Sequence, residues 1–84
     1  MTQYELIPRN GRISFYGKAI VTEVDGNKIL TSYTTDVARI DSEGRFTRLW
    51  NGYSATTMNH INSFRLMNGL NALTKKEWLE IPVM

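Results

Sequence analysis

Arg45, Arg48, Trp50 and Tyr53 lie within nine residues and form the densest group of chemically capable side chains in this 84-residue sequence. Aromatic rings can stack on nucleic-acid bases while guanidinium groups pair with phosphates. The same aromatics are also natural packing residues between a sheet and a helix, and a solvated face is the default for arginine. The group therefore predicts either a nucleic-acid surface or ordinary packing.

The charge distribution extends this group into a basic half. Residues 44–76 contain no Asp or Glu, although the whole chain carries a net charge of only +2. The five bases of this span are Arg45, Arg48, Arg65, Lys75 and Lys76. An excess of positive charge confined to one half of a chain is an argument about partners, and here it favours nucleic acid or a nucleoprotein.

Hydroxyl groups gather just before an apolar, helix-spaced run. Ser54, Thr56 and Thr57 follow Gly52, and hydroxyls and backbone N–H groups at a helix start can hold a phosphate. The spacing matches neither the Walker loop nor the dinucleotide fingerprint. Hydroxyls in a first turn mostly cap the helix, so capping is the main alternative to anion binding.

His60 is the only histidine, and the chain has no cysteine. A metal site would need further ligands at helical spacing, and residues 44–76 offer no carboxylate. We expect no metal, no cofactor and no catalytic residue, and hence no enzyme. His60 itself is expected at the polar surface or boundary of its helix.

Arg65 projects close to the Met58–Ile61 side of the same helix. Its stem either follows the edge of the core or lies in a groove that faces a partner. Asn59, Ser63 and Thr56 would form an uncharged polar face on the opposite side. The candidate binding surface comprises Arg45, Arg48, Trp50, Tyr53, Thr56, His60, Arg65, Lys75 and Lys76.

Strands must precede this region. Glycine-containing turns at 25–27 and 42–44 separate runs rich in Val, Ile, Thr, Phe and Tyr, which predicts two hairpins. The expected strands lie near 18–24, 28–34, 36–41 and 45–50. In the last of these, Phe46, Arg48 and Trp50 point one way. Asn10-Gly11 is a third turn signal, and residues 13–16 after it could add a short strand.

Two helices follow the strands. Ser54 is the preferred N-cap of a main helix over about 54–68, with Thr56 or Thr57 as alternatives, and Gly69 suits its left-handed end. Thr74 and Glu77 fit a capping box that opens a short helix over about 74–80. Residues 1–84 are therefore expected to form one small α+β domain. An antiparallel sheet of three to five strands would pack against the main helix.

Composition limits the cellular context. The absence of cysteine excludes a disulfide framework, and no signal peptide or run of ~18 apolar residues is present. We expect a cytoplasmic protein that does not engage a membrane. A thin core and possible sheet edges leave a homodimer open.

The segments SYTTDVARID, RLWNGYSATTMNHINSF, NGL and KKEW resemble a family of short uncharacterised proteins of bacteriophages and mobile elements of Gram-positive bacteria. Its central motif reads W-x-GYSATTM-x-H-[IV]-x-x-F, and the resemblance runs from Ser32 to Trp78. The family is a domain of unknown function. The resemblance therefore implies a phage-like origin, acting in the host cell, and no activity to transfer.

Two functions remain from these observations. The first is a non-enzymatic binding module that contacts nucleic acid or a nucleoprotein complex through residues 44–76. The alternative is a protein-directed inhibitor or adaptor of host machinery, such as an antagonist of a host defence nuclease. In that case Trp50, Tyr53 or Arg65 would be the anchors.

Overall fold

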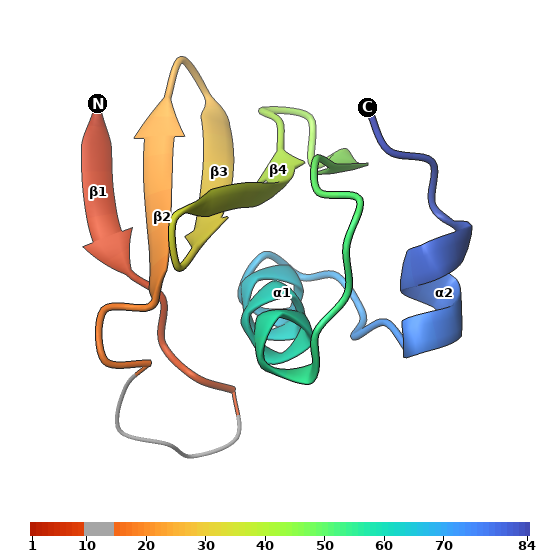
Figure 1. Ribbon diagram of the computed structural model, residues 1–84. Coiled ribbons are helices and arrows are strands. Elements are labelled where there is room, and N and C mark those ends of the chain that lie inside the picture. Colours follow the sequence, from red (N-terminus) through yellow and green to blue (C-terminus); the bar gives the residue numbers. More distant parts are fainter. Residues whose placement is uncertain (10–14) are drawn as a thin grey trace.

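The computed structural model describes residues 1–9 and 15–84 and shows an α+β fold (Figure 1). Five antiparallel strands form one sheet in the order β1-β2-β3-β4-β5, and two helices follow. The elements are β1 (Thr2–Glu5), β2 (Ala19–Val24), β3 (Asn27–Ser32), β4 (Thr35–Ile40), β5 (Phe46–Arg48), α1 (Ala55–Met67) and α2 (Lys75–Glu80). The predicted fold class is confirmed.

Both predicted hairpin turns are present. Asp25 and Gly26 have φ values of 52° and 81° between β2 and β3, which is the two-residue turn that matches strand twist. Between β4 and β5, Gly44 has a φ of 83° in the loop that joins the two strands. The side chain of Asp41 accepts the backbone N–H groups of Glu43 and Arg45, and so holds this loop in shape.

The first strand, β1, was not predicted from the sequence. β1 has the sequence TQYE, which is short and polar and lacks an apolar alternation. It is recognisable only through its pairing with β2, where Tyr4 lies opposite Val21. The predicted turn at Asn10-Gly11 lies outside the described residues, as does the start of the possible strand at 13–16. Phe15 and Tyr16 are described and belong to no strand.

One face of the sheet packs against α1. Val21, Leu30 and Ala38 are fully buried there and share the core with Ile61 and Phe64 of the helix. The last strand continues this face: Phe46 and Trp50 pack against the core and Arg48 is buried, so the shared direction predicted for these three side chains is confirmed. The core face therefore runs along the helix-bearing side of the whole sheet.

The ends of α1 agree with the sequence signals. The Ser54 hydroxyl accepts the backbone N–H of Thr57 at 3.0 Å, which makes Ser54 the N-cap. At the other end Gly69 has a φ of 80°, and the N–H of Leu70 donates to the carbonyl of Arg65 at 2.8 Å. This is the expected left-handed helix end.

The middle of α1 is buried around most of its circumference, since Thr57, Met58 and all of residues 60–64 are buried. Besides the sheet, the N-terminal segment covers it, since the backbone N–H of Arg9 donates to the Ser63 hydroxyl. The segment before α2 covers it as well: the Asn62 side chain bonds both the N–H and the carbonyl of Leu73. The uncharged polar face predicted on α1 is therefore wrong at Ser63, which is only 2% exposed.

α2 begins with the predicted capping box, in which Thr74 and Glu77 bond each other's backbone N–H groups. Its Trp78 is fully buried and donates from its indole N–H to the Gly52 carbonyl. A Cβ at Gly52 would lie 2.4 Å from the Trp50 ring, so close packing accounts for this glycine. Beyond α2, Val83 pairs with Arg48 and covers the outer edge of β5.

Candidate functional site

Arg48 does not lie on a surface. It is 4% exposed, and its guanidinium donates to the carbonyls of Trp50, Trp78 and Ile81 at 2.9 to 3.1 Å. The group also stacks 4.4 Å from the centre of the Trp78 ring. Its predicted exposure is wrong, because three backbone carbonyls and an aromatic ring replace water around the charge. Arg48 joins β5 to the end of α2.

His60 is also buried, at 1% exposed, and the predicted surface or boundary position is wrong. Its Nδ1 lies 2.8 Å from the Ser32 hydroxyl, which in turn lies 3.1 Å from the Thr57 hydroxyl. The Phe15 ring packs edge-to-face with the imidazole, with the ring centres 4.5 Å apart. The three polar groups link β3 to α1 inside the core.

Arg65 follows the core edge, which was one of its two predicted positions. Its Nε donates to the Asn71 carbonyl at 2.7 Å, and its guanidinium lies 4.5 Å from the centre of the Phe46 ring. Partial burial lowers the pKa of Arg65, and the charge of Glu77 opposes this effect. Arg65 is thus engaged within the molecule.

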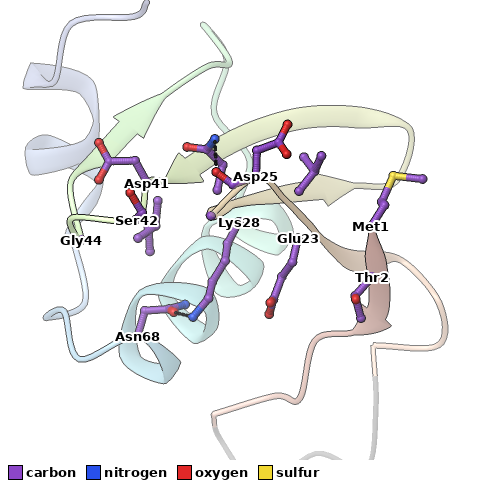
Figure 2. Close-up of a pocket in the computed structure, with 13 residues that line it drawn as sticks. Met1, Thr2, Glu23, Asp25, Lys28, Asp41, Ser42, Gly44 and Asn68 are labelled. Carbon is purple, nitrogen blue, oxygen red and sulfur yellow. Dashed lines mark hydrogen bonds between the residues drawn. The ribbon is translucent and has the colours of Figure 1, made fainter.

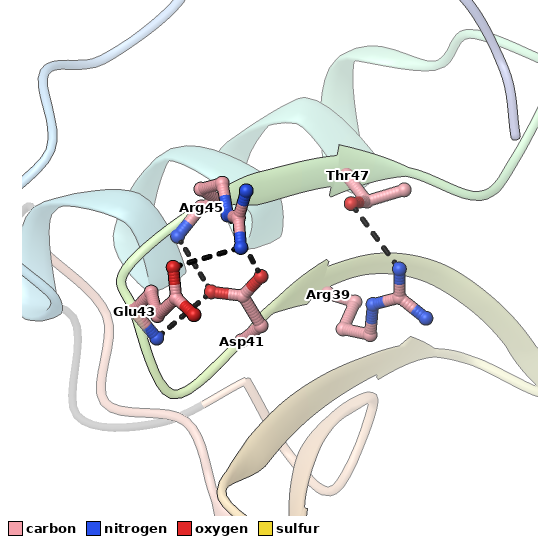
Figure 3. A network of polar contacts seen from close by, with 5 residues as sticks. All are labelled: Arg39, Asp41, Glu43, Arg45 and Thr47. Carbon is pink, nitrogen blue, oxygen red and sulfur yellow. Dashed lines mark hydrogen bonds and ion pairs between the residues drawn. The ribbon is translucent and has the colours of Figure 1, made fainter.

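Arg45 is exposed but paired (Figure 3). Its guanidinium contacts Asp41 at 3.3 Å and Glu43 at 2.8 Å. Hydrogen bonds from the Arg45 and Glu43 backbone, together with the Arg45 charge, hold the pKa of Asp41 below its usual value. Asp41 and Glu43 both lie just before residues 44–76 in the chain. Because they pair with Arg45, the effective positive charge of residues 44–76 is lower than the five bases alone suggest.

The exposed remainder of the predicted surface gathers where the two helices begin. Tyr53 precedes the N-cap of α1 and is 39% exposed, and the Lys75 ammonium lies 4.7 Å from the centre of its ring. Lys76 and Thr56 are exposed beside these positions in the chain. We call these four residues, Tyr53, Thr56, Lys75 and Lys76, the helix-start surface. No acid occupies the first turn of α1.

The predicted residues therefore do not form one surface. Trp50 is partly buried against the core, and Arg45 belongs to the turn between β4 and β5. Figure 1 shows this turn well away from the points where α1 and α2 begin. The structure brings together Tyr53 and Lys75, which are distant in sequence. It separates them from Arg48 and His60, which are internal.

A hollow of about 660 Å³, which sequence analysis did not anticipate, lies at one end of the sheet (Figure 2). Lys28 reaches across it to the Asn68 side chain at 2.6 Å. Glu23, which lines the hollow, accepts a hydrogen bond from the Tyr4 hydroxyl, and burial together with this hydrogen bond raises the pKa of Tyr4 to about 12. The charged residues lining it are Glu23, Asp25, Lys28 and Asp41.

A signal for this hollow was present in the sequence. In an antiparallel meander alternate turns lie at the same end, so the turns at 25–27 and 42–44 must be neighbours. A Cβ placed on Gly26 would lie 3.0 Å from the Cβ of Ser42, which shows how closely the two turns approach. Two of the three acids there are already engaged, because Asp41 pairs with Arg45 and Glu23 with Tyr4.

Within residues 1–9 and 15–84, no three His, Cys, Asp or Glu side chains gather as a metal site would require. No helix in the same part of the chain has the length and apolar character to cross a bilayer.

Residues 4–80 match a family of unknown function (DUF8033). The match begins well before Ser32, where the predicted resemblance started, and thus includes most of the sheet. No curated protein and no solved structure matches the chain.

Proposed function

The chain belongs to a family of unknown function (DUF8033), and we propose that it is a non-enzymatic binding domain that contacts nucleic acid through its basic half, residues 44–76. The observation that carries the proposal is the stacking of Lys75 on the exposed ring of Tyr53 beside the start of α1. A bacteriophage or mobile-element origin, and action in the host cytoplasm, belong to the same proposal.

The contact falls on the helix-start surface. A ring that already accepts a cation on its face can stack with a base, while Lys75 and Lys76 neutralise the phosphates on either side. The N-terminus of α1 adds a favourable dipole, and no carboxylate in its first turn opposes an anion. Because Arg48 and Arg65 bond groups within the molecule, the proposed contact area with nucleic acid is small. Stacking on Tyr53 accepts any base, so we expect little preference for nucleotide sequence.

Fluorescence anisotropy with labelled single-stranded and double-stranded oligonucleotides tests this function. We expect binding at low salt that weakens as salt rises, and a preference for single strands because stacking needs an accessible base. Tyr53→Ala should weaken binding by about 1–3 kcal/mol. The double variant with Lys75→Ala and Lys76→Ala should depend less on salt. The slope of the logarithm of the binding constant against the logarithm of the salt concentration should fall in magnitude by about 0.7 for each phosphate that these two lysines neutralise.

Lys18 and Tyr33 provide a matched control. Lys18 lies 5.6 Å from the centre of the exposed Tyr33 ring, which reproduces the same pairing outside the basic half. Lys18→Ala and Tyr33→Ala should leave oligonucleotide binding nearly unchanged. Equal weakening for the two pairs, or no binding at low salt, would contradict nucleic-acid binding at this surface.

A protein-directed inhibitor or adaptor is the second candidate, and the open face of the sheet favours it. Ile20, Ile29 and Leu49 lie on this face, which neither described helix covers. Arg39 lies there too; its Nε is buried without a hydrogen-bond partner among the described residues, and its Nη2 reaches Thr47 only at 3.4 Å. Absence of oligonucleotide binding, with a host protein captured by the wild type but not by Arg39→Ala, would favour this function.

A further inference from the structure

The two edges of the sheet are treated differently. At the β5 edge, Val83 pairs with Arg48 and the backbone N–H of Met84 donates to the Arg48 carbonyl at 3.0 Å. At the opposite edge, no described strand pairs with the outer side of β1 (Figure 1, red). An unpaired strand edge is a template for a further strand unless a bulge, proline or charge blocks it.

β1 has little that blocks pairing. Its register with β2 is regular from Thr2 to Glu5, without a bulge, and Glu5 is its one charged residue. Thr2, Gln3 and Glu5 are exposed. On either side of these residues lie two large exposed apolar side chains, Met1 at 92% and Ile7 at 73%. An uncovered edge bounded by apolar residues indicates an association site.

The backbone fixes which groups are available. Leu6 donates its N–H to the Ala19 carbonyl, so Tyr4 and Thr2, two and four residues earlier, also direct their backbone groups at β2. Gln3 and Glu5 alternate with them and direct their N–H and C=O groups outward. These are the groups that a further strand would bond.

We propose that β1 is an association edge and that a second copy of this chain occupies it, paired antiparallel about a two-fold axis between the two Tyr4 residues. Such an interface is isologous and joins two five-stranded sheets into one. Gln3 then lies opposite the partner's Glu5, and Met1 lies opposite the partner's Ile7. Each contact occurs twice.

Charge and polarity select this register. With the axis at Glu5, two carboxylates face each other, which is unfavourable across strands. With the axis at Gln3, two amides face each other and Met1 lies opposite the carboxylate of the partner's Glu5. Only the axis at Tyr4 matches an amide with a carboxylate and two exposed apolar side chains with each other. The Gly17 N–H occupies Oε1 of Glu5, which leaves Oε2 to accept the amide of the partner's Gln3.

Two substitutions at Gln3 test the register through opposite effects. Gln3→Glu places like charges opposite each other and should weaken dimerisation, whereas Gln3→Lys places opposite charges there and should strengthen it. Because the pair occurs twice, each change should alter the dimer Kd by about tenfold. Sedimentation velocity over a range of protein concentrations measures the Kd, and added salt should reduce the difference between the variants.

Thr22 provides the matched control. It is the neighbour of Gln3 on β2 and lies on the same face, but it is one strand away from the proposed partner. Thr22→Glu and Thr22→Lys should therefore give similar dimer affinities. A separate measurement concerns hydrogen exchange: the Gln3 and Glu5 amides should exchange more slowly as concentration rises, while the Tyr4 amide is protected at every concentration.

A chain that stays monomeric at millimolar concentration would overturn the proposal, whether or not β1 accepts a strand from another protein. So would a dimer whose affinity is indifferent to the sign of charge at residue 3, because another surface would then form it. Fast exchange of the Gln3 and Glu5 amides in the dimer would exclude strand pairing. Oligonucleotide binding is measured separately, so either proposal can fail alone.

Discussion

Arg48 shows how a charged residue can be part of the core. Its three carbonyl acceptors come from the chain after β5 and from the end of α2, so one side chain holds two segments that are distant in sequence. No carboxylate is among these partners. The positive charge is stabilised by the negative ends of peptide dipoles and by the face of Trp78.

Replacing Arg48 should destabilise the fold strongly. Arg48→Met leaves buried carbonyls without donors, and we expect the free energy of unfolding to fall by about 2–4 kcal/mol. Arg48→Lys should cost less, because a lysine can satisfy some of the carbonyls but not all. Urea denaturation followed by circular dichroism measures both values.

Arg45→Met is the matched control, since Arg45 is an exposed arginine three residues away whose ion pairs are on the surface. It should change stability by no more than about 1 kcal/mol. If Arg48→Met were as mild as Arg45→Met, the carbonyl contacts would not stabilise the protein.

At the scale of elements, the capping box of α2 couples stability to pH. Hydrogen bonds from the Thr74 backbone and side chain lower the pKa of Glu77, with a smaller contribution from Arg65. A carboxyl whose pKa is lower in the folded state stabilises the fold above its unfolded pKa, and this contribution is lost as pH falls through the folded pKa. α2 should therefore loosen in acid.

Glu77→Gln tests this coupling. Glutamine can still accept the Thr74 N–H but does not titrate, so the variant should lose less stability than the wild type between about pH 5 and pH 3. Urea denaturation at several pH values gives the comparison. Glu80→Gln removes a carboxylate of α2 that is not part of the capping box, and should not show this gain. An unchanged acid slope in Glu77→Gln would rule out the cap as its source.

Local signals explain which elements were predictable. The turns at Gly26 and Gly44, the Ser54 cap, the Gly69 end and the Thr74 capping box each depend on a few adjacent residues, and the structure confirms each of them. β1 could not be predicted, because its four residues, three of them polar, acquire strand structure only from β2. The turns and helix ends were thus encoded by residues next to one another in the sequence, whereas the strand character of β1 depends on its pairing with β2.

At the scale of the whole molecule, burial was the quantity that the sequence did not reveal. A helix against a sheet is expected to have one wet side, but α1 is also covered by the segments around Arg9 and Leu73. Those segments are irregular and carry no periodic signal. His60 and Ser63 were therefore predicted at the surface of α1, although both are buried. Of the predicted candidate site, the helix-start surface is the part that remains exposed and gathered together.

The two sheet edges lead to a prediction for the assembly. Deleting Val83 and Met84 exposes the β5 edge, so each molecule would present two edges instead of one. Association through two different edges does not close, and we expect species larger than a dimer. Multi-angle light scattering should detect them.

Met84→Ala, which keeps the backbone N–H that bonds Arg48, should behave as the wild type does. Deletion without any increase in size would show that the C-terminal residues do not protect this edge.

The buried cluster of Ser32, Thr57 and His60 has a consequence for where α1 can rest. The hydrophobic effect is not directional, so Ile61 and Phe64 alone would fix the position of α1 on the sheet less strictly than hydrogen bonds do. A shift by one turn would separate the imidazole from both hydroxyls and break these hydrogen bonds in the interior. The polar cluster thus selects one position of α1 on the sheet, and the cost of misplacement, more than the gain from correct placement, makes the native arrangement unique.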